Sequence, residues 1–151
     1  MMDKNVAYKK LQVGDELIFF ELVLLFNKEF ESPNKDYVNI ENTTDLLLNP
    51  FFACIVAIKG DEVIGGLTGY ELPMYDQMGS TLYLYDIAVG MNYQRKGIGS
   101  SLVRQLVEYC KSKQINDIFV QAEAIDQHAV DFYRKLGGEI SSVCHFTFTV
   151  K

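Results

Sequence analysis

Two basic residues and two glycines stand together at Arg95, Lys96, Gly97 and Gly99, between an apolar run and a segment with helical periodicity. Glycines at the start of a helix let the backbone approach a ligand closely, and the free N–H groups of the first helical turn attract an anion. The two cationic side chains add charge at the same place. The stretch therefore predicts a phosphate site, and the alternative is a plain strand-to-helix turn whose glycines serve only geometry.

The glycine spacing excludes two common kinds of phosphate loop. The dinucleotide fingerprint requires a third glycine, and Leu102 stands at that position. The nucleoside triphosphate loop requires a Gly-Lys-Ser/Thr ending, which is absent. Any phosphate bound here thus belongs to another kind of ligand.

A carboxylate lies within the apolar run "TLYLYDIAV" that precedes the glycines. Strict strand alternation places Asp86 on one face with Leu82, Leu84 and Ala88. An unpaired carboxylate on an apolar face is costly, so Asp86 is a candidate general base or a binder of a substrate ammonium. The alternative is an aspartate at a bulge that is hydrogen-bonded to backbone. Glu123, at the end of the next predicted strand, is a candidate for either role.

Three further acids are candidates for an acidic substrate cleft because they fall in loops near the same sheet end, and solvated surface acids are the alternative: Glu71, Asp76 and Asp126. His128 in a first helical turn is expected to be exposed, whereas for His145 in a strand a packing role and a functional role both stay open. No residues have metal-ligand spacing, so no metal is expected. The three cysteines are expected to be buried free thiols.

These residues must be positioned by a mixed α/β (α+β) fold. Helices are expected at 15–30, 42–48 and 126–136, and another begins at Ile98. The first has Leu17, Phe20, Leu24 and Leu25 on its apolar side. Strands are expected at 6–12, 51–58, 63–72, 81–89, 117–123 and 142–150. This order predicts one domain over 1–151, with a central βαβ unit in a mostly antiparallel sheet flanked by helices.

Two motifs in this order resemble the signatures of the GNAT family of N-acetyltransferases. "QRKGIG" matches Q/R-x-x-G-x-G/A, which binds the pyrophosphate of acetyl-coenzyme A in that family, and "AVDFYRKLGG" resembles the second signature. Gly138 departs from the family's final Phe, and Asp126 replaces a frequent Asn. The resemblance implies an acetyl-CoA site made of Ile87, Ala88, Val89, Gln94, Arg95, Lys96, Gly97, Ile98, Gly99 and Ser100.

The stretches 64–89 and 142–148 are also similar to bacterial aminoglycoside 3-N-acetyltransferases. That resemblance implies direct transfer of acetyl to a primary amine, and Tyr85 and Asp86 are expected on the substrate side. Tyr133 matches the family tyrosine placed near the coenzyme sulfur, which makes it the candidate general acid; a core aromatic is the alternative. The oxyanion donor is expected to be a backbone N–H between Ile87 and Val89.

Composition limits the partners. The chain has 151 residues, 48% of them apolar, and a net charge of −6, which favours a cationic small-molecule amine and disfavours nucleic acid. No apolar run approaches the roughly 20 residues of a membrane span and no secretory signal is evident, so a cytoplasmic protein is expected. The family resemblance favours a homodimer. Rival functions are acetylation of a polyamine, metabolite or protein amine, and a non-catalytic coenzyme-binding module.

Overall fold

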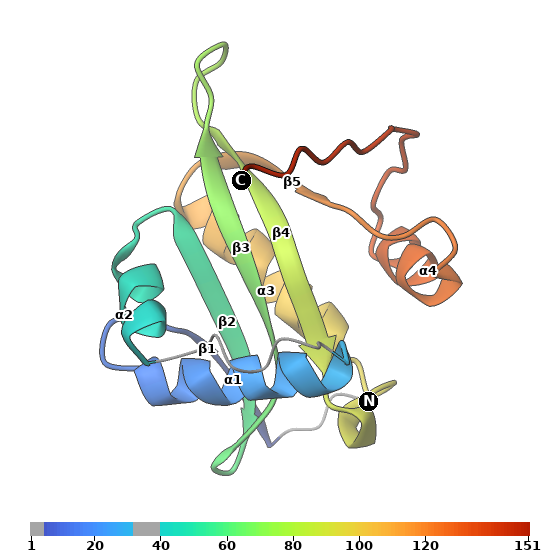
Figure 1. The fold of residues 1–151 in the computed structure, drawn as a ribbon. Coiled ribbons are helices and arrows are strands. Elements are labelled where there is room, and N and C mark those ends of the chain that lie inside the picture. Colours follow the sequence, from blue (N-terminus) through green and yellow to red (C-terminus); the bar gives the residue numbers. More distant parts are fainter. Residues whose placement is uncertain (1–4, 32–39) are drawn as a thin grey trace. The chain divides into compact units, whose positions relative to one another are not determined.

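A computed structural model describes residues 5–31 and 40–151 and shows a five-stranded mixed sheet (Figure 1). The strands follow the order β1-β2-β3-β4-β5, antiparallel up to β4, and β5 runs parallel to β4. Their bounds are β1 (Val6–Lys10), β2 (Phe52–Lys59), β3 (Glu62–Pro73), β4 (Ser80–Val89) and β5 (Ile115–Val120). The predicted fold class and the βαβ unit formed by β4, the next helix and β5 are confirmed.

The chain divides into two compact units, Met1–Gln121 and Ala122–Lys151. The first holds the sheet with α1 (Glu16–Glu29), α2 (Ile40–Leu48), a 3₁₀ turn η2 (Met91–Tyr93) and α3 (Ile98–Ser112). The second holds α4 (Gln127–Lys135) and the C-terminal segment. A single domain over 1–151 stays a prediction.

Helices cover both faces of the sheet in the first unit, where α1 crosses the front and α3 lies behind in Figure 1. On α3 the apolar face consists of Ile98, Leu102, Leu106 and Cys110, which are all buried. No helix among the described residues combines the length and apolar character that a membrane-spanning helix requires.

The buried side of α1 differs from the predicted one. Phe19, Leu22 and Phe26 are buried, whereas Leu17 and Leu24 are 68% and 51% exposed. The segment "LIFFELVLLF" is apolar almost all round, so its periodicity does not choose a face. The residues that α1 presents to the sheet, Phe26 among them, become important for the site below.

A β-bulge interrupts β4 at Tyr85. Leu84 pairs with Gly69 and Asp86 pairs with Thr68, so the two partners are adjacent in β3 while Tyr85 between them has no partner. The strict alternation expected over 82–88 is therefore wrong. An extra residue in one strand shifts the alternation of side chains by one position. Even-numbered residues before the bulge and even-numbered residues after it therefore point to opposite faces of the sheet.

The predicted strand at 142–150 is absent. Residues 138–151 hold no regular secondary structure, and Phe146, Phe148 and Val150 are 77%, 88% and 94% exposed. An alternating pattern supplies a side-chain face, but a strand also needs a neighbour for its hydrogen bonds. Cys144 in this segment is exposed, unlike Cys54 and Cys110, so the expectation of three buried thiols is wrong for it.

The structure also ends β5 at Val120, three residues before the predicted end. Glu123 therefore follows the end of the strand in sequence and belongs to the second unit. The residues at 121–123 are polar or small and have no strong strand preference, so the sequence does not define where this strand ends.

Candidate active site

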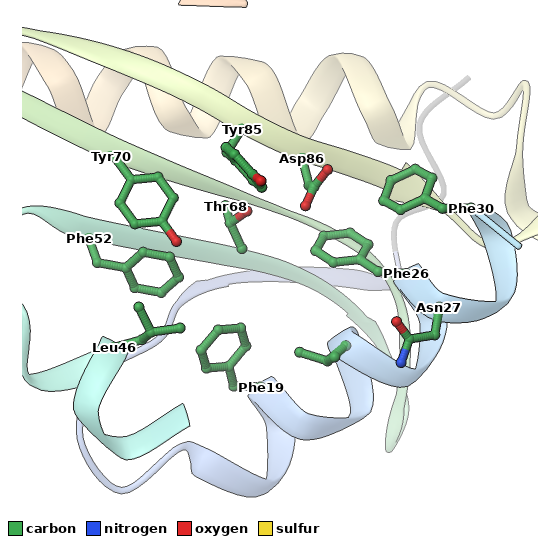
Figure 2. Close-up of a pocket in the computed structure, with 11 residues that line it drawn as sticks. Phe19, Phe26, Asn27, Phe30, Leu46, Phe52, Thr68, Tyr70, Tyr85 and Asp86 are labelled. Carbon is green, nitrogen blue, oxygen red and sulfur yellow. The ribbon is translucent and has the colours of Figure 1, made fainter. Parts of the chain in front are cut away.

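A pocket of about 210 Å³ opens on the α1 face of the sheet (Figure 2). It is bounded by α1, one residue of α2, and the facing parts of β2, β3 and β4. Apolar and aromatic side chains dominate its walls, with few polar groups. The lining residues are Phe19, Val23, Phe26, Asn27, Phe30, Leu46, Phe52, Thr68, Tyr70, Tyr85 and Asp86.

Aromatic rings form a connected wall along one side of this pocket. Ring centroids lie 5.5 Å apart between Phe19 and Phe52, 5.2 Å between Phe52 and Tyr70, and 5.6 Å between Tyr70 and Tyr85. The faces of such rings carry negative potential and attract cations. The wall is thus suited to a ligand that bears a positive charge.

Asp86 is the carboxylate of this pocket, and the bulge is the reason it points there. Tyr85 and Asp86 are consecutive residues, yet both line the same cavity, which strict alternation forbids. Ala88, two residues later, packs against the core under α1 that contains Phe19 and Leu22. Asp86 thus shares the α1 face with Ala88 and has left the face of Leu82, which lies against Gly69.

The Asp86 carboxylate is half-buried, and this burial raises its pKa above the ordinary value. Among the described residues no N–H or O–H donates to it and no cation pairs with it. The alternative interpretation of Asp86 is an aspartate at a bulge that is hydrogen-bonded to backbone. The bulge is present, but no backbone N–H among the described residues donates to this carboxylate. A partly desolvated carboxylate without a partner favours a cationic ligand, and a raised pKa makes it a stronger base.

Tyr70 lies beside this carboxylate. Its pKa is raised by burial and further by the neighbouring Tyr85 and Asp86, so its hydroxyl stays protonated and can donate. Neither Tyr70 nor the α1 aromatics stood out in the sequence as site residues. The sequence gives little indication that these aromatic residues line a site, because aromatic residues at strand and helix spacing are also usual in a hydrophobic core.

The far end of β4 has an open backbone edge. β5 pairs with β4 only as far as Leu84, and the N–H of Gly90 donates to the carbonyl of Ile64 in β3 at 2.9 Å. Because backbone groups alternate sides along a strand, the N–H groups of Ile87 and Val89 point to the opposite edge, away from β3. The carbonyl of Val89 agrees with this direction, since it accepts from Nε2 of Gln94 at 2.9 Å.

The glycine loop opens α3 as the sequence predicted. Gly97 is the N-cap with φ 79°, in the left-handed region, and no side chain caps the first turn. Arg95 also has a positive φ of 60°. Such alternation of backbone conformation turns successive N–H groups inward as an anion-binding concavity, and the N-terminus of a 15-residue helix adds its dipole. The loop therefore fits a phosphate group.

Two side chains of the loop brace it. Gln94 holds the end of β4 through Val89 and approaches Oε2 of Glu29 in α1 at 3.4 Å. Nζ of Lys96 donates to the carbonyl of Asn92 at 2.9 Å and lies 5.5 Å from the ring of Tyr93. The loop is thereby fixed to both the sheet and α1.

Two predicted cleft acids lie outside the pocket. Glu71 accepts hydrogen bonds from Oγ of Ser80 at 2.6 Å and from Nζ of Lys113 at 3.0 Å. Burial alone would raise the pKa of Glu71, but these hydrogen bonds and the Lys113 charge lower it. This carboxylate is therefore engaged by α3. Asp76 is an exposed loop residue.

The other predicted residues belong to the second unit. Tyr133 is half-buried on α4, and its ring lies edge-on to Phe132 with centroids 5.1 Å apart. Asp126 caps α4 by accepting from the N–H of Ala129 at 3.1 Å. Glu123 is exposed, as are His128 and His145. Catalytic or substrate roles for Tyr133, Asp126 and Glu123 stay predictions.

Within 5–31 and 40–151 no group of three or more His, Cys, Asp or Glu is placed to hold a metal ion.

Comparison with known proteins identifies a family and solved structures that match most or all of the chain. The sequence pattern of the Acetyltransferase (GNAT) family matches residues 19–138. Crystal structures of an aminoglycoside acetyltransferase from an uncultured soil metagenomic sample, one with trehalose and one with sisomicin, superpose with a TM-score of 0.95. They are 34% and 33% identical to this chain and cover 100% of both chains.

Curated relatives are more distant. Human N-alpha-acetyltransferase 30 is 25% identical over 138 residues, which is 89% of this chain and 35% of that protein. The thialysine N-epsilon-acetyltransferase of Sus scrofa is 31% identical over 96 residues, covering 59% of this chain and 56% of that protein. The chain thus spans about a third to a half of the length of these curated relatives.

Proposed function

The chain belongs to the acetyltransferase (GNAT) family, and from this premise we propose that it transfers an acetyl group from acetyl-CoA to a primary amine. In this proposal Asp86 binds the amine. The observation that carries the proposal is the half-buried Asp86 carboxylate, which faces an aromatic pocket and has no cationic partner among the described residues. An ammonium ion satisfies both the carboxylate and the rings. A neutral or anionic acceptor satisfies neither.

The coenzyme supplies an activated acetyl group as a thioester. We propose that its pyrophosphate is held by the N–H groups at the start of α3, with charge from Arg95 and Lys96. One N–H of the open β4 edge, that of Ile87 or Val89, donates to the acetyl oxygen, where negative charge develops during transfer. Ala88 is set aside in this proposal because its N–H points toward β3.

Asp86 has two consecutive tasks in this proposal. It first binds the amine as an ammonium ion, and it then removes a proton because only the neutral amine has a lone pair for attack. Its raised pKa brings the carboxylate closer to the pKa of the amine, which eases that transfer. Tyr133 is proposed to donate its hydroxyl proton to the departing sulfur. The acetyl group moves directly to nitrogen without a covalent intermediate on the protein.

The proposed acceptor is an aminoglycoside, acetylated at its 3-amino group. The support is the metagenomic aminoglycoside acetyltransferase, which matches over the full length and whose structure holds sisomicin. The net charge of −6 favours a polycation. The rival within enzymes is another amine, as the names N-alpha-acetyltransferase and thialysine acetyltransferase among the relatives suggest. A homodimer in the cytoplasm stays a prediction.

The test is thiol release from acetyl-CoA with a panel of amines: sisomicin, gentamicin, spermidine, lysine and a peptide with a free N-terminus. We expect turnover with the two aminoglycosides, and mass spectrometry with NMR should place the acetyl group on the 3-amino nitrogen. Turnover with spermidine or the peptide alone would assign another acceptor. Binding of acetyl-CoA without thiol release for any amine would indicate a coenzyme-binding module.

A glycine substitution tests the coenzyme site separately. Gly97→Ala places a side chain in the left-handed region, at a conformational cost of about 1–2 kcal/mol, and disturbs the N-cap. We expect the Kd for CoA to rise about tenfold. Gly60→Ala is the matched control, because Gly60 has a φ of 61° but lies in the β2–β3 turn. Equal losses of CoA affinity in both variants would contradict the site.

A further inference from the structure

Tyr70 presents a hydroxyl group to the interior of the pocket that Asp86 lines. The ring of Tyr70 is held between those of Phe52, at 5.2 Å, and Tyr85, at 5.6 Å. Figure 2 shows its hydroxyl end turned into the space between Phe52 and Thr68. The hydroxyl oxygen lies on the axis about which the ring turns, so ring flips do not move it. The structure thus fixes one polar atom within a wall of aromatic carbon.

This hydroxyl has no partner in the protein, yet a ligand can reach it. No hydrogen bond joins it to Asp86 or to any other described residue. Among the described residues, the buried side-chain polar atoms that lack a partner comprise only Nδ2 of Asn27, so the oxygen of Tyr70 stays open to water or a ligand. Phe19 and Leu46 lie across the pocket and carry no acceptor. A ligand that displaces the water must therefore supply the partner itself, because an unpaired polar group is costly once it is desolvated.

The charge of Asp86 limits which chemical group can be that partner. Burial, and then the neighbouring Tyr85 and Asp86, raise the pKa of Tyr70, so its hydroxyl stays protonated and has a hydrogen to donate. A second ammonium group on the ligand has no lone pair, so it leaves this hydrogen unpaired. A carboxylate on the ligand would be repelled by Asp86 in the same pocket. A neutral hydroxyl or ether oxygen accepts the hydrogen without either penalty.

We propose that Tyr70 is a specificity-determining residue that donates its hydroxyl hydrogen to a neutral oxygen of the acceptor, while Asp86 holds the amine. The two groups are neighbours on the sheet, because Asp86 pairs with Thr68 and Tyr70 lies two residues beyond Thr68 on the same face of β3. The enzyme then prefers amino alcohols, such as amino sugars, to alkyl amines that lack the oxygen. This inference rests on the proposed function, since it assigns the acceptor to this pocket.

The experiment compares two amines that differ by one hydroxyl group, cyclohexylamine and 2-aminocyclohexanol, in the wild type and in Tyr70→Phe. Kd is measured by ligand-observed NMR with CoA present, which requires no turnover, and kcat/KM is measured by thiol release from acetyl-CoA. We expect Tyr70→Phe to shift the ratio of the two Kd values by about tenfold in favour of cyclohexylamine, because the hydrogen bond to the amino alcohol is lost. Intrinsic differences between the amines cancel when the ratios of two proteins are compared.

Tyr83→Phe is the matched control. The Tyr83 ring lies 5.6 Å from that of Tyr85 but is not part of the pocket lining, and its hydroxyl donates to Oε1 of Gln121 at 2.9 Å. This variant should keep the wild-type ratio. An unchanged ratio in Tyr70→Phe, which retains the ring and its packing, would overturn the inference, as would an equal shift in both variants. Thiol release with neither amine, together with the expected shift in Kd, would instead count against the proposed reaction and leave the role of Tyr70 supported.

Discussion

Asp86→Asn is expected to lower kcat/KM for the amine by about 100–1,000-fold, within the range for loss of a general base, while the Kd for acetyl-CoA stays the same. The variant keeps the size of the side chain but removes the charge that holds the ammonium and the lone pair that takes its proton. The coenzyme contacts proposed here lie on the β4 edge and the α3 N-terminus, so they are not altered. Steady-state kinetics with each substrate varied in turn measures both quantities.

The pH profile gives a second readout for Asp86. Burial raises the pKa of this carboxyl, so the acidic limb of kcat/KM should lie above the ordinary aspartate value of about 3.9. Activity should rise as pH increases through that limb, because the base must be ionised. Asp86→Asn should abolish the limb rather than displace it.

Stability should move in the opposite direction to activity. A carboxyl whose folded pKa is above its unfolded pKa favours the folded state less once pH exceeds the folded value. At neutral pH, Asp86→Asn should therefore unfold at the same temperature as the wild type or a higher one. Asp61→Asn, at an exposed hairpin turn, is the matched control for both measurements. Unchanged kinetics in Asp86→Asn, together with a lower unfolding temperature, would make the residue structural.

Tyr133→Phe is expected to reduce kcat by about 100-fold, the lower end of general acid–base effects. The phenol hydroxyl is removed while the ring that lies against Phe132 remains, so α4 should keep its packing. If the hydroxyl gives its proton to the leaving sulfur, the deficit appears in turnover and the Kd for CoA changes little. Rapid-mixing measurements of thiol release isolate that step.

Tyr75→Phe provides the control for Tyr133→Phe, because Tyr75 is fully exposed in the loop after β3. Its kcat should equal that of the wild type. A thiol with a lower pKa than coenzyme A should rescue Tyr133→Phe, since a better leaving group needs less protonation. A kcat in Tyr133→Phe equal to the wild-type value would assign the residue to packing alone.

The glycine loop that is proposed to bind the coenzyme is predictable in its backbone structure because its physics is local. A strand, a left-handed glycine and an uncapped helix N-terminus are consecutive in sequence, so "YDIAVGMNYQRKGIG" contains most of the information. The structure adds only how the loop is braced, through Gln94 and Lys96.

The acceptor side was less predictable because it is assembled from distant segments. Strict alternation groups Asp86 with Leu82 and Leu84, whereas the bulge places it on the opposite face, in the wall of the pocket. The aromatic walls come from α1, β2 and β3, and these residues have the same pattern as ordinary core residues. The sequence makes Glu71 a candidate cleft acid, but in the structure Lys113, 42 positions later, pairs with it. Contacts of this range are set by packing and leave no local signature.

The bulge at Tyr85 allows one strand to serve two compartments. Before it, the inward-facing residues of β4 build the interior beside α3, and after it the same backbone supplies a carboxylate to a ligand. Removing Tyr85 would make the ladder regular, with Leu84 still opposite Gly69 and Asp86 still opposite Thr68 on the pocket face, but the pocket would lose one aromatic side chain. The inserted residue therefore lets two consecutive side chains, Tyr85 and Asp86, face the same ligand, which a regular strand does not allow.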